Sequence, residues 1–245
     1  MSSTSDMQST TLEAINYHLF PTTVSRTESV VSELEKDLWF KLYLKHSSSD
    51  GRSHDFLGFE TVQTDELFHD LFMNRLKQGV DEYLKHLNIS RDNLDVQLTK
   101  CFFNVTDKSA INLHDHAENH ISFTYYPHVA KDKDRNLVFH NPTHNNEPYQ
   151  NFFLKNCKEW TEYNCLNDGL PVSEGVMYVF PSKMLHDIEM RQDDIPSEVL
   201  PFTSKESLRN SRFCVAGDLL YTRKVDVPIY SRLLSSPENW RKVYE

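Results

Sequence analysis

Two stretches near the start of the chain carry apolar residues at helical spacing. The first runs from Thr27 to Lys45, where Ser, Glu and Lys occupy the other face. The second opens near Thr64 or Asp65 and continues to Leu87, after a polar break over residues 47–51. Apolar positions three and four residues apart form one stripe on an α-helix. We therefore expect two amphipathic helices, preceded by a mobile polar tail over residues 1–12.

After Arg91 the pattern changes to short runs rich in β-branched and aromatic residues, separated by Asn, Asp, Gly and Pro. Such runs indicate strands, and their spacing is typical of an antiparallel barrel or sandwich. Two long irregular segments, Asn141 to about Ser173 and Arg191 to about Ser211, interrupt them and are candidates for substrate contact. The expected strands are Val96–Val105, His120–Tyr126, Asn136–His140, Gly175–Phe180, His186–Met190 and Arg212–Tyr221.

Length and charge limit the class of protein. The chain has 245 residues, enough for one sizeable core. We expect a single domain over 1–245, with a helical N-terminal support over 13–92, a catalytic core over 93–230 and a C-terminal segment over 231–245. A net charge of −10 argues against a general nucleic-acid binder. The sequence contains no apolar stretch long enough to cross a bilayer and no secretory leader pattern, so we expect a cytoplasmic protein without a membrane partner.

Three histidines occupy positions suited to an iron site. His114 and His116 are two residues apart where a strand begins, so both side chains are expected on the same face. His186 follows a buried strand that stops at Pro181. Fe(II) that activates O₂ needs three protein ligands on one face, with the other positions left open. In a chain with 12 histidines the HxH pair alone also fits ordinary solvated or core side chains.

A strand arginine follows the histidines in the sequence. Arg212 opens an apolar segment that ends at Gly217 and should be a buried strand. A buried guanidinium requires an anionic partner, and the planar carboxylate of 2-oxoglutarate suits a bidentate fork. An internal carboxylate, such as that of Asp218, is the alternative partner.

This ordered set resembles the 2-oxoglutarate/Fe(II)-dependent oxygenase superfamily, most closely its small bacterial, phage and algal branch with an HxH first motif. The resemblance covers roughly residues 94–222 and implies a mainly β fold with flanking helices, a cupin-like double-stranded β-helix or jelly roll. It implies His114 and His186 as metal ligands and Arg212 as the anchor of the far carboxylate of 2-oxoglutarate. It further implies Asn104 and Tyr126 as co-substrate contacts. The matching segments are Asn104, His114-Asp-His116, His120-Ile-Ser-Phe-Thr-Tyr-Tyr126, Asn136–Pro142, Gly175–His186 and Arg212.

The third metal position departs from the family pattern. Most of the superfamily has HxD or HxE, whereas this chain has His116, and imidazole also suits Fe(II). Asp115 is the runner-up to His116. Asp115 or Glu118 could reach the metal if a bulge turned the chain, which would leave His116 or His120 as hydrogen-bond partners. A cupin-like three-histidine dioxygenase that needs no 2-oxoglutarate is a further alternative, and Arg212 argues against it.

The resemblance implies an O₂-dependent enzyme that abstracts hydrogen from an unactivated C–H bond and releases succinate and CO₂. Hydroxylation, desaturation and oxidative cyclisation all start from that abstraction. The acidic charge and the lack of an extra domain favour a small metabolite, for example one derived from an amino acid. The alternatives are a catalytically silent jelly-roll binding module and a hydroxylase of protein side chains. The candidate substrate contacts are His140, Asn141, His144, Asn145, Tyr149 and Arg191.

Overall fold

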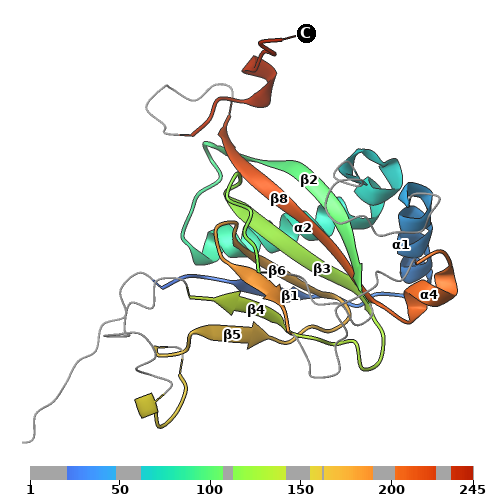
Figure 1. The fold of residues 1–245 in the computed structure, drawn as a ribbon. Helices are drawn as coiled ribbons and strands as arrows, with labels where there is room; N and C mark the ends of the chain where they lie inside the picture. The colour runs from blue at the N-terminus through green and yellow to red at the C-terminus, as the bar shows by residue number, and fades with distance from the viewer. Residues whose placement is uncertain are drawn as a thin grey trace, which may run out of the picture.

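The computed structural model describes residues 21–47, 62–106, 113–141, 155–161, 163–189, 202–224 and 233–244. Within these residues the chain is mainly β with a few helices, and all strand pairings are antiparallel (Figure 1). A five-stranded sheet has the order β1-β6-β3-β8-β2, and a three-stranded sheet has the order β5-β4-β7. The strands are β1 Ser25–Glu28, β2 Leu94–Thr106, β3 Ile121–Val129, β4 Leu137–His140, β5 Asn167–Leu170, β6 Val176–Pro181, β7 His186–Ile188 and β8 Arg212–Arg223.

All of the expected strands are present, and most of their ends lie within one or two residues of the prediction. The last expected residue of β7, Met190, lies outside the described residues. The segments expected to be irregular contain two further elements. Asn167–Leu170 forms β5 against β4, and Lys205–Arg209 forms the short helix α4. The prediction of an irregular segment was wrong for β5 because this strand is polar and its pairing depends on a partner distant in the sequence.

The first helix begins later than its apolar pattern predicts. Helix α1 spans Glu33–His46, and the side chain of Ser32 caps its N-terminus. The start at Thr27 was wrong, because residues 25–28 form β1 and hydrogen-bond along β6 instead. Val30 and Leu34 are 93% and 73% exposed, so they do not belong to the buried stripe of the helix. The second helix, α2 (Glu66–His86), begins as expected, with Asp65 as its N-cap.

A glycine ties β1 to the rest of the sheet. Gly175 has a φ of 82°, and a side chain there would meet the backbone oxygen of Ser29. Its amide donates to the carbonyl of Tyr126 at 2.7 Å, and its carbonyl accepts from the amide of Ser29 at 3.0 Å. Glycine alone combines this left-handed backbone with so close an approach. The chain leading into α1 is thereby linked, through Gly175, to the carbonyl of Tyr126 on β3.

Aromatic side chains fill the space between the two long helices and one face of the large sheet. Trp39 of α1 makes ring contacts with Phe72 of α2, Phe103 of β2 and Tyr125 of β3, and all four are nearly or fully buried. Figure 1 shows α1 and α2 packed against the large sheet, with β4 and β5 lying away from both helices. Because side chains alternate across a strand, the residues between these aromatic positions point to the opposite face. That face is the one available for a functional site.

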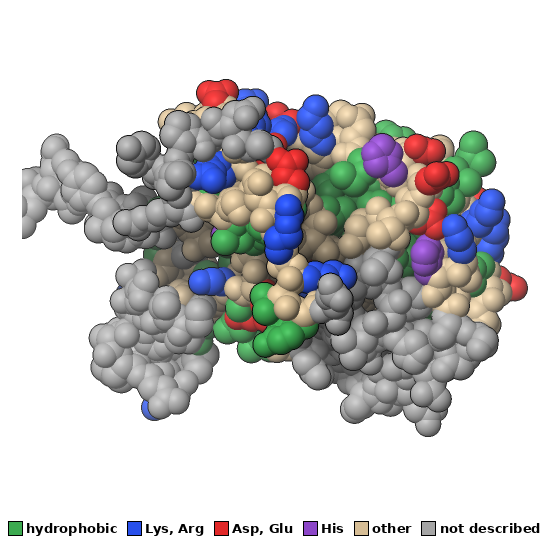
Figure 2. All heavy atoms as spheres, turned by 90° about the horizontal axis from the view of Figure 1, so that it is seen from above, with side chains coloured by type: hydrophobic (Ala, Val, Ile, Leu, Met, Phe, Trp, Pro, Cys, Tyr) green, Lys and Arg blue, Asp and Glu red, His purple; other side chains and the backbone are tan. Residues whose placement is uncertain are grey.

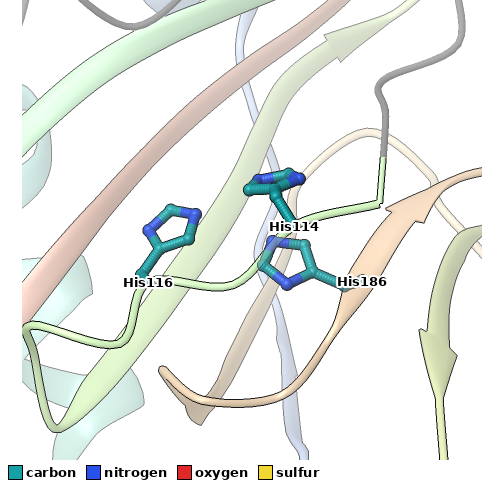
Figure 3. A group of neighbouring side chains, drawn as sticks. All are labelled: His114, His116 and His186. Carbon is teal, nitrogen blue, oxygen red and sulfur yellow. The ribbon is translucent and has the colours of Figure 1, made fainter. Parts of the chain in front are cut away.

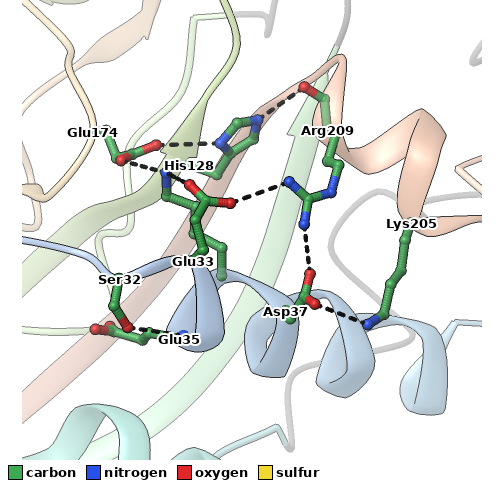
Figure 4. A network of polar contacts seen from close by, with 9 residues as sticks. Ser32, Glu33, Glu35, Asp37, His128, Glu174, Lys205 and Arg209 are labelled. Carbon is green, nitrogen blue, oxygen red and sulfur yellow. Dashed lines mark hydrogen bonds and ion pairs between the residues drawn. The ribbon is translucent and has the colours of Figure 1, made fainter.

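A polar network fastens the start of β8 to α1 (Figure 4). The guanidinium of Arg209, in α4, lies 3.1 Å from the carboxylate of Glu33 and 2.8 Å from that of Asp37. His128 places one ring nitrogen 2.9 Å from the carbonyl of Arg209 and the other 3.2 Å from Glu174. Exposed ion pairs contribute little free energy each, so the consequence of this network is geometric. It positions α4, and with it the first residue of β8, Arg212.

No helix among the described residues is long and apolar enough to span a membrane. On the face shown in Figure 2, basic and acidic side chains are interspersed, so the described part of that face carries no continuous basic surface.

The N-cap of α2 makes a testable contribution to acid stability. The hydrogen bonds from Lys45 and His46 lower the pKa of Asp65 to about 2, below the ordinary value of about 3.9. A depressed folded-state pKa stabilises the protein above the unfolded pKa, and this stabilisation is lost as pH falls towards the folded value. We expect Asp65→Asn, which keeps a capping side chain, to lower the free energy of unfolding most above about pH 4. The gap should close towards about pH 2.

Urea unfolding of both proteins between these pH values measures the gap. Asp70→Asn is the matched control, because that side chain is 81% exposed on the same helix. A gap that stays constant with pH would contradict the prediction.

Candidate metal centre and its pocket

Three histidines from two segments of the chain lie close together (Figure 3). His114 and His116 precede β3, and His186 is the first residue of β7. The backbones of His114 and His186 exchange two hydrogen bonds, of 3.1 and 2.9 Å, which places these distant segments side by side. One ligand nitrogen from each of the three rings lies within 4.8 Å of the others. The rings of His114 and His186 are 4.4 Å apart between centroids.

The second ring nitrogen of two of these histidines is already occupied. Nδ1 of His186 lies 2.8 Å from the carbonyl of Met184, which can only accept, so Nδ1 carries the proton. Nδ1 of His116 lies 2.6 Å from Oδ1 of Asp218. Both rings therefore keep Nε2 for another partner. Burial lowers the pKa of His186 to about 4, so this imidazole is neutral at neutral pH, as a metal ligand must be.

The carboxylate beside His116 is itself enclosed in polar contacts. Asp218 is fully buried, and its Oδ1 also accepts a hydrogen bond of 2.6 Å from the hydroxyl of Ser122. The ammonium of Lys100 lies 3.4 Å from its Oδ2. Lys100, Asp218 and Ser122 are direct neighbours across β2, β8 and β3. Burial raises the pKa of Asp218, but the hydrogen bond from His116 and the other contacts outweigh it, so the pKa is lowered overall.

The histidines open onto a pocket on the face of the large sheet that points away from the helices. The pocket and the solvent-open space at its mouth together amount to about 430 Å³. Alternate residues of three adjacent strands line it, because every second side chain points to this face. These residues are Phe102 and Asn104 on β2, Ser122, Thr124 and Tyr126 on β3, and Arg212, Cys214 and Ala216 on β8.

Arg212 contributes a buried positive charge to this pocket. The residue is 2% exposed, and its Nη2 donates a hydrogen bond of 3.0 Å to the hydroxyl of Tyr126. The guanidinium carbon also lies 4.7 Å from the centre of the Tyr126 ring. Among the residues that the structure describes, its Nε has no hydrogen-bond partner and no carboxylate pairs with it. A buried charge in this state requires an anion, so the pocket is suited to an anionic ligand.

The structure separates the competing candidates for the third metal position. His116 joins the histidine cluster, whereas Asp115 and Glu118 are exposed and belong to no such cluster among the described residues. His120 faces elsewhere, since its Nδ1 accepts from the amide of Tyr221 at 2.8 Å. The alternative in which Asp218 pairs with Arg212 is wrong, because Asp218 pairs with His116.

The predicted substrate contacts that the structure describes do not line the pocket. His140 pairs with Asp187 at 3.0 Å, and neither His140 nor the exposed Asn141 is among the lining residues. The remaining four candidates lie outside the described residues: His144, Asn145, Tyr149 and Arg191.

Sequence reasoning missed the polar lining of the sheet, notably Ser122 and Thr124, and the role of Asp218. A signal for them existed. From Arg212 every second residue of the strand leads to Asp218, so the two side chains share one face. Polar residues at such positions in an otherwise apolar strand indicate a site rather than a core.

Comparison with known proteins adds evidence at the level of the fold. No protein-family model and no curated protein matches the sequence. Among solved structures, the chain is similar to SnoN, a non-haem α-ketoglutarate-dependent epimerase from nogalamycin biosynthesis. The two are 11% identical, the match covers 91% of this chain and 86% of SnoN, and the TM-score is 0.50. The chain has the fold of SnoN.

Two further structures have lower scores. The carbocyclase SnoK, also from nogalamycin biosynthesis, is 11% identical over 83% of this chain and 82% of its own, with a TM-score of 0.49. A 2OG-Fe(II) oxygenase family oxidoreductase from Burkholderia pseudomallei is 11% identical over 69% of this chain, with a TM-score of 0.40. The match spans 63% of the Burkholderia chain. The likeness to SnoN, at 11% identity, bears out the expected resemblance at the level of the fold alone.

Proposed function

We propose that this protein is a non-haem Fe(II) oxygenase that uses 2-oxoglutarate and O₂ to attack an unactivated C–H bond of a small molecule. The observation that carries the proposal is the presence, in one pocket, of three convergent imidazoles and a buried guanidinium whose Nε has no hydrogen-bond partner among the described residues. The imidazoles suit a divalent transition metal, and the guanidinium suits the far carboxylate of a keto acid. The fold shared with SnoN supports the same conclusion.

The donor set fits Fe(II), although it lacks the usual carboxylate. His116 and His186 would bind through Nε2, because each Nδ1 is engaged by a hydrogen-bond acceptor. His114 would supply the third nitrogen. Imidazole is a suitable ligand for iron, and three protein ligands leave positions for a co-substrate.

The far carboxylate of 2-oxoglutarate would meet Arg212 and the hydroxyl of Tyr126, which already lie 3.0 Å apart. A carboxylate beside the guanidinium would give its unpartnered Nε an acceptor. Asn104 lies on the neighbouring strand β2 and lines the same pocket, so its amide is placed to contact the co-substrate. These residues would hold the keto acid with its reactive end towards the histidines.

When bound, Fe(II) with 2-oxoglutarate and O₂ would supply the oxidising chemistry that removes hydrogen from a C–H bond, with succinate and CO₂ as co-products. The residues of the chain determine where this happens. Phe180 lies 4.9 Å from Phe139 and 5.1 Å from His186 between ring centroids. This apolar wall would keep water from one side of the metal position and would orient the target carbon.

The proposal extends to the way the two sheets are joined and to the size of the substrate. We infer that the two sheets form the halves of a cupin-like double-stranded β-helix, with residues 93–230 as the catalytic core of a single domain. SnoN is described as an α-ketoglutarate-dependent epimerase from nogalamycin biosynthesis. For this chain we propose a small-molecule substrate, with hydroxylation, desaturation and cyclisation as the possible outcomes.

The test is consumption of the co-substrate. Purified protein is loaded anaerobically with Fe(II), mixed with 2-oxoglutarate and exposed to O₂, and succinate is measured by mass spectrometry. We expect slow succinate formation that requires all three components even without the main substrate. A protein that binds no metal and forms no succinate would instead be a silent binding module. Incubation with cell extract, followed by metabolite profiling and peptide mapping, then distinguishes a small-molecule substrate from a protein side chain.

A further inference from the structure

An acidic residue on a distant strand contacts the histidine cluster. Asp218 on β8 lies 2.6 Å from Nδ1 of His116, and both residues are buried. Because a carboxylate contact of this kind keeps the proton on Nδ1, it leaves the Nε2 lone pair free for a metal. It also makes the imidazole a stronger donor.

The surroundings of Asp218 hold it in place for this contact. Ser122 donates to the same oxygen at 2.6 Å, and the hydroxyl of Ser182 lies 2.9 Å from that of Ser122. The backbone amide of His116 donates to the carbonyl of Ser182 at 2.8 Å, so the chain carrying the ring is fixed to the same group. Lys100 approaches the other carboxylate oxygen at 3.4 Å. Ring, backbone and carboxylate thus form one buried unit.

We propose that Asp218 is a positioning residue that supplies, through the imidazole of His116, the negative charge that a carboxylate ligand provides directly in an HxD site. This inference rests on the proposed function, since it requires His116 to be a ligand. It also accounts for the histidine at position 116. A carboxylate there would face Asp218 inside a buried site, and two adjacent carboxylates cannot both remain ionised cheaply.

The first experiment measures Co(II) affinity by anaerobic calorimetry, with Co(II) as a redox-stable probe of the iron position. We expect Asp218→Asn to bind Co(II) about 10–100-fold more weakly than wild type. Lys100 favours the amide oxygen of the new side chain, which turns the NH₂ group towards His116 and selects the tautomer whose Nε2 is protonated. The visible absorption of bound Co(II), which reports the ligand field, should shift as well.

Asp115→Asn is the matched control. It removes one carboxylate charge next to His116 in the sequence, but the side chain of Asp115 is exposed and belongs to no metal-binding cluster among the described residues. We expect its Co(II) affinity and absorption to stay close to wild type. A folded Asp218→Asn protein that binds Co(II) as tightly as wild type would overturn the proposal, because Asp218 would then serve structure alone.

A charge exchange keeps the proposal testable if the single variant does not fold. His116→Asp alone should bind Co(II) poorly, because it sets a second carboxylate against Asp218. Adding Asp218→Asn to His116→Asp restores a single negative charge and should strengthen Co(II) binding. In this background Asp218→Asn thus has the opposite effect to the one expected in the wild-type protein. Weakening in both backgrounds would refute the positioning role. His186→Ala serves as the reference for the metal site: if it kept full Co(II) affinity, the proposed function would fail, independently of Asp218.

Discussion

Replacing His186 with alanine is expected to weaken metal binding more than about 100-fold, beyond the effect of losing a partner that only orients a ligand. The reason is geometric. His186 joins β7 to the segment before β3 through two backbone hydrogen bonds, and its ring brings a neutral Nε2 to the other two imidazoles. Without it, His114 and His116 offer only two nitrogens from one segment of chain. Metal content after anaerobic loading, measured by mass spectrometry of the bound metal, reports the loss.

His140→Ala is the matched control for this prediction. His140 lies on β4, the strand that pairs with β7, and its ring contacts Asp187 rather than the histidine cluster. We expect this variant to retain one metal per chain. Metal content that is unchanged in His186→Ala would contradict the ligand assignment, provided that circular dichroism shows the variant to be folded.

Replacing Arg212 with alanine is expected to raise the KM for 2-oxoglutarate at least about 100-fold, since a hydrogen bond to a charged group is worth about 1.5–3 kcal/mol and a fork makes two. Co(II) affinity without co-substrate should change little, because the guanidinium hydrogen-bonds Tyr126 and not the histidines. The measurement is succinate formation as a function of 2-oxoglutarate concentration. A separation of the two effects would assign Arg212 to the co-substrate and the histidines to the metal.

Two milder variants test the geometry of this anchor. Arg212→Lys keeps the charge but loses the planar fork, so its KM should lie between those of wild type and Arg212→Ala. Tyr126→Phe removes the hydroxyl that Arg212 donates to and should raise the KM less than Arg212→Ala does. A co-substrate requirement unchanged in Arg212→Ala would favour a three-histidine dioxygenase that needs no 2-oxoglutarate.

Local patterns in the sequence were sufficient for most of the elements. The apolar stripe of α2 and its capping Asp65 are set within a few residues of each other, and the structure has them as expected. The strands around Tyr126 and Arg212 were equally readable, because they are long and buried and their residue types favour strands. Among the strands, the errors fall on β1 and β5, which are short and polar. Backbone hydrogen bonds to β6 and β4 stabilise these two strands, and their own residue types do not predict this pairing.

The histidine cluster shows the same division. The spacing of His114 and His116 and the later positions of His186 and Arg212 carry a pattern that sequence alone could recognise. Whether His116 or Asp115 points towards the proposed metal position depends on the conformation of the chain before β3. This segment contains a bridge and a turn, so the two-residue period of a strand does not predict which side chain points inward. The backbone bond from His116 to Ser182 directs the ring inward and leaves Asp115 exposed.

The mainly β class of fold, the long helices and strands, and the set of residues suited to an iron site could all be predicted from the chain, because they follow from periodicity and residue chemistry within short windows. Two features could be learned only from the folded structure: Asp218 partners His116 rather than Arg212, and the guanidinium has no carboxylate partner among the described residues. Those facts depend on the register of β8 between β2 and β3. Such a register joins residues about a hundred positions apart, which no local pattern encodes.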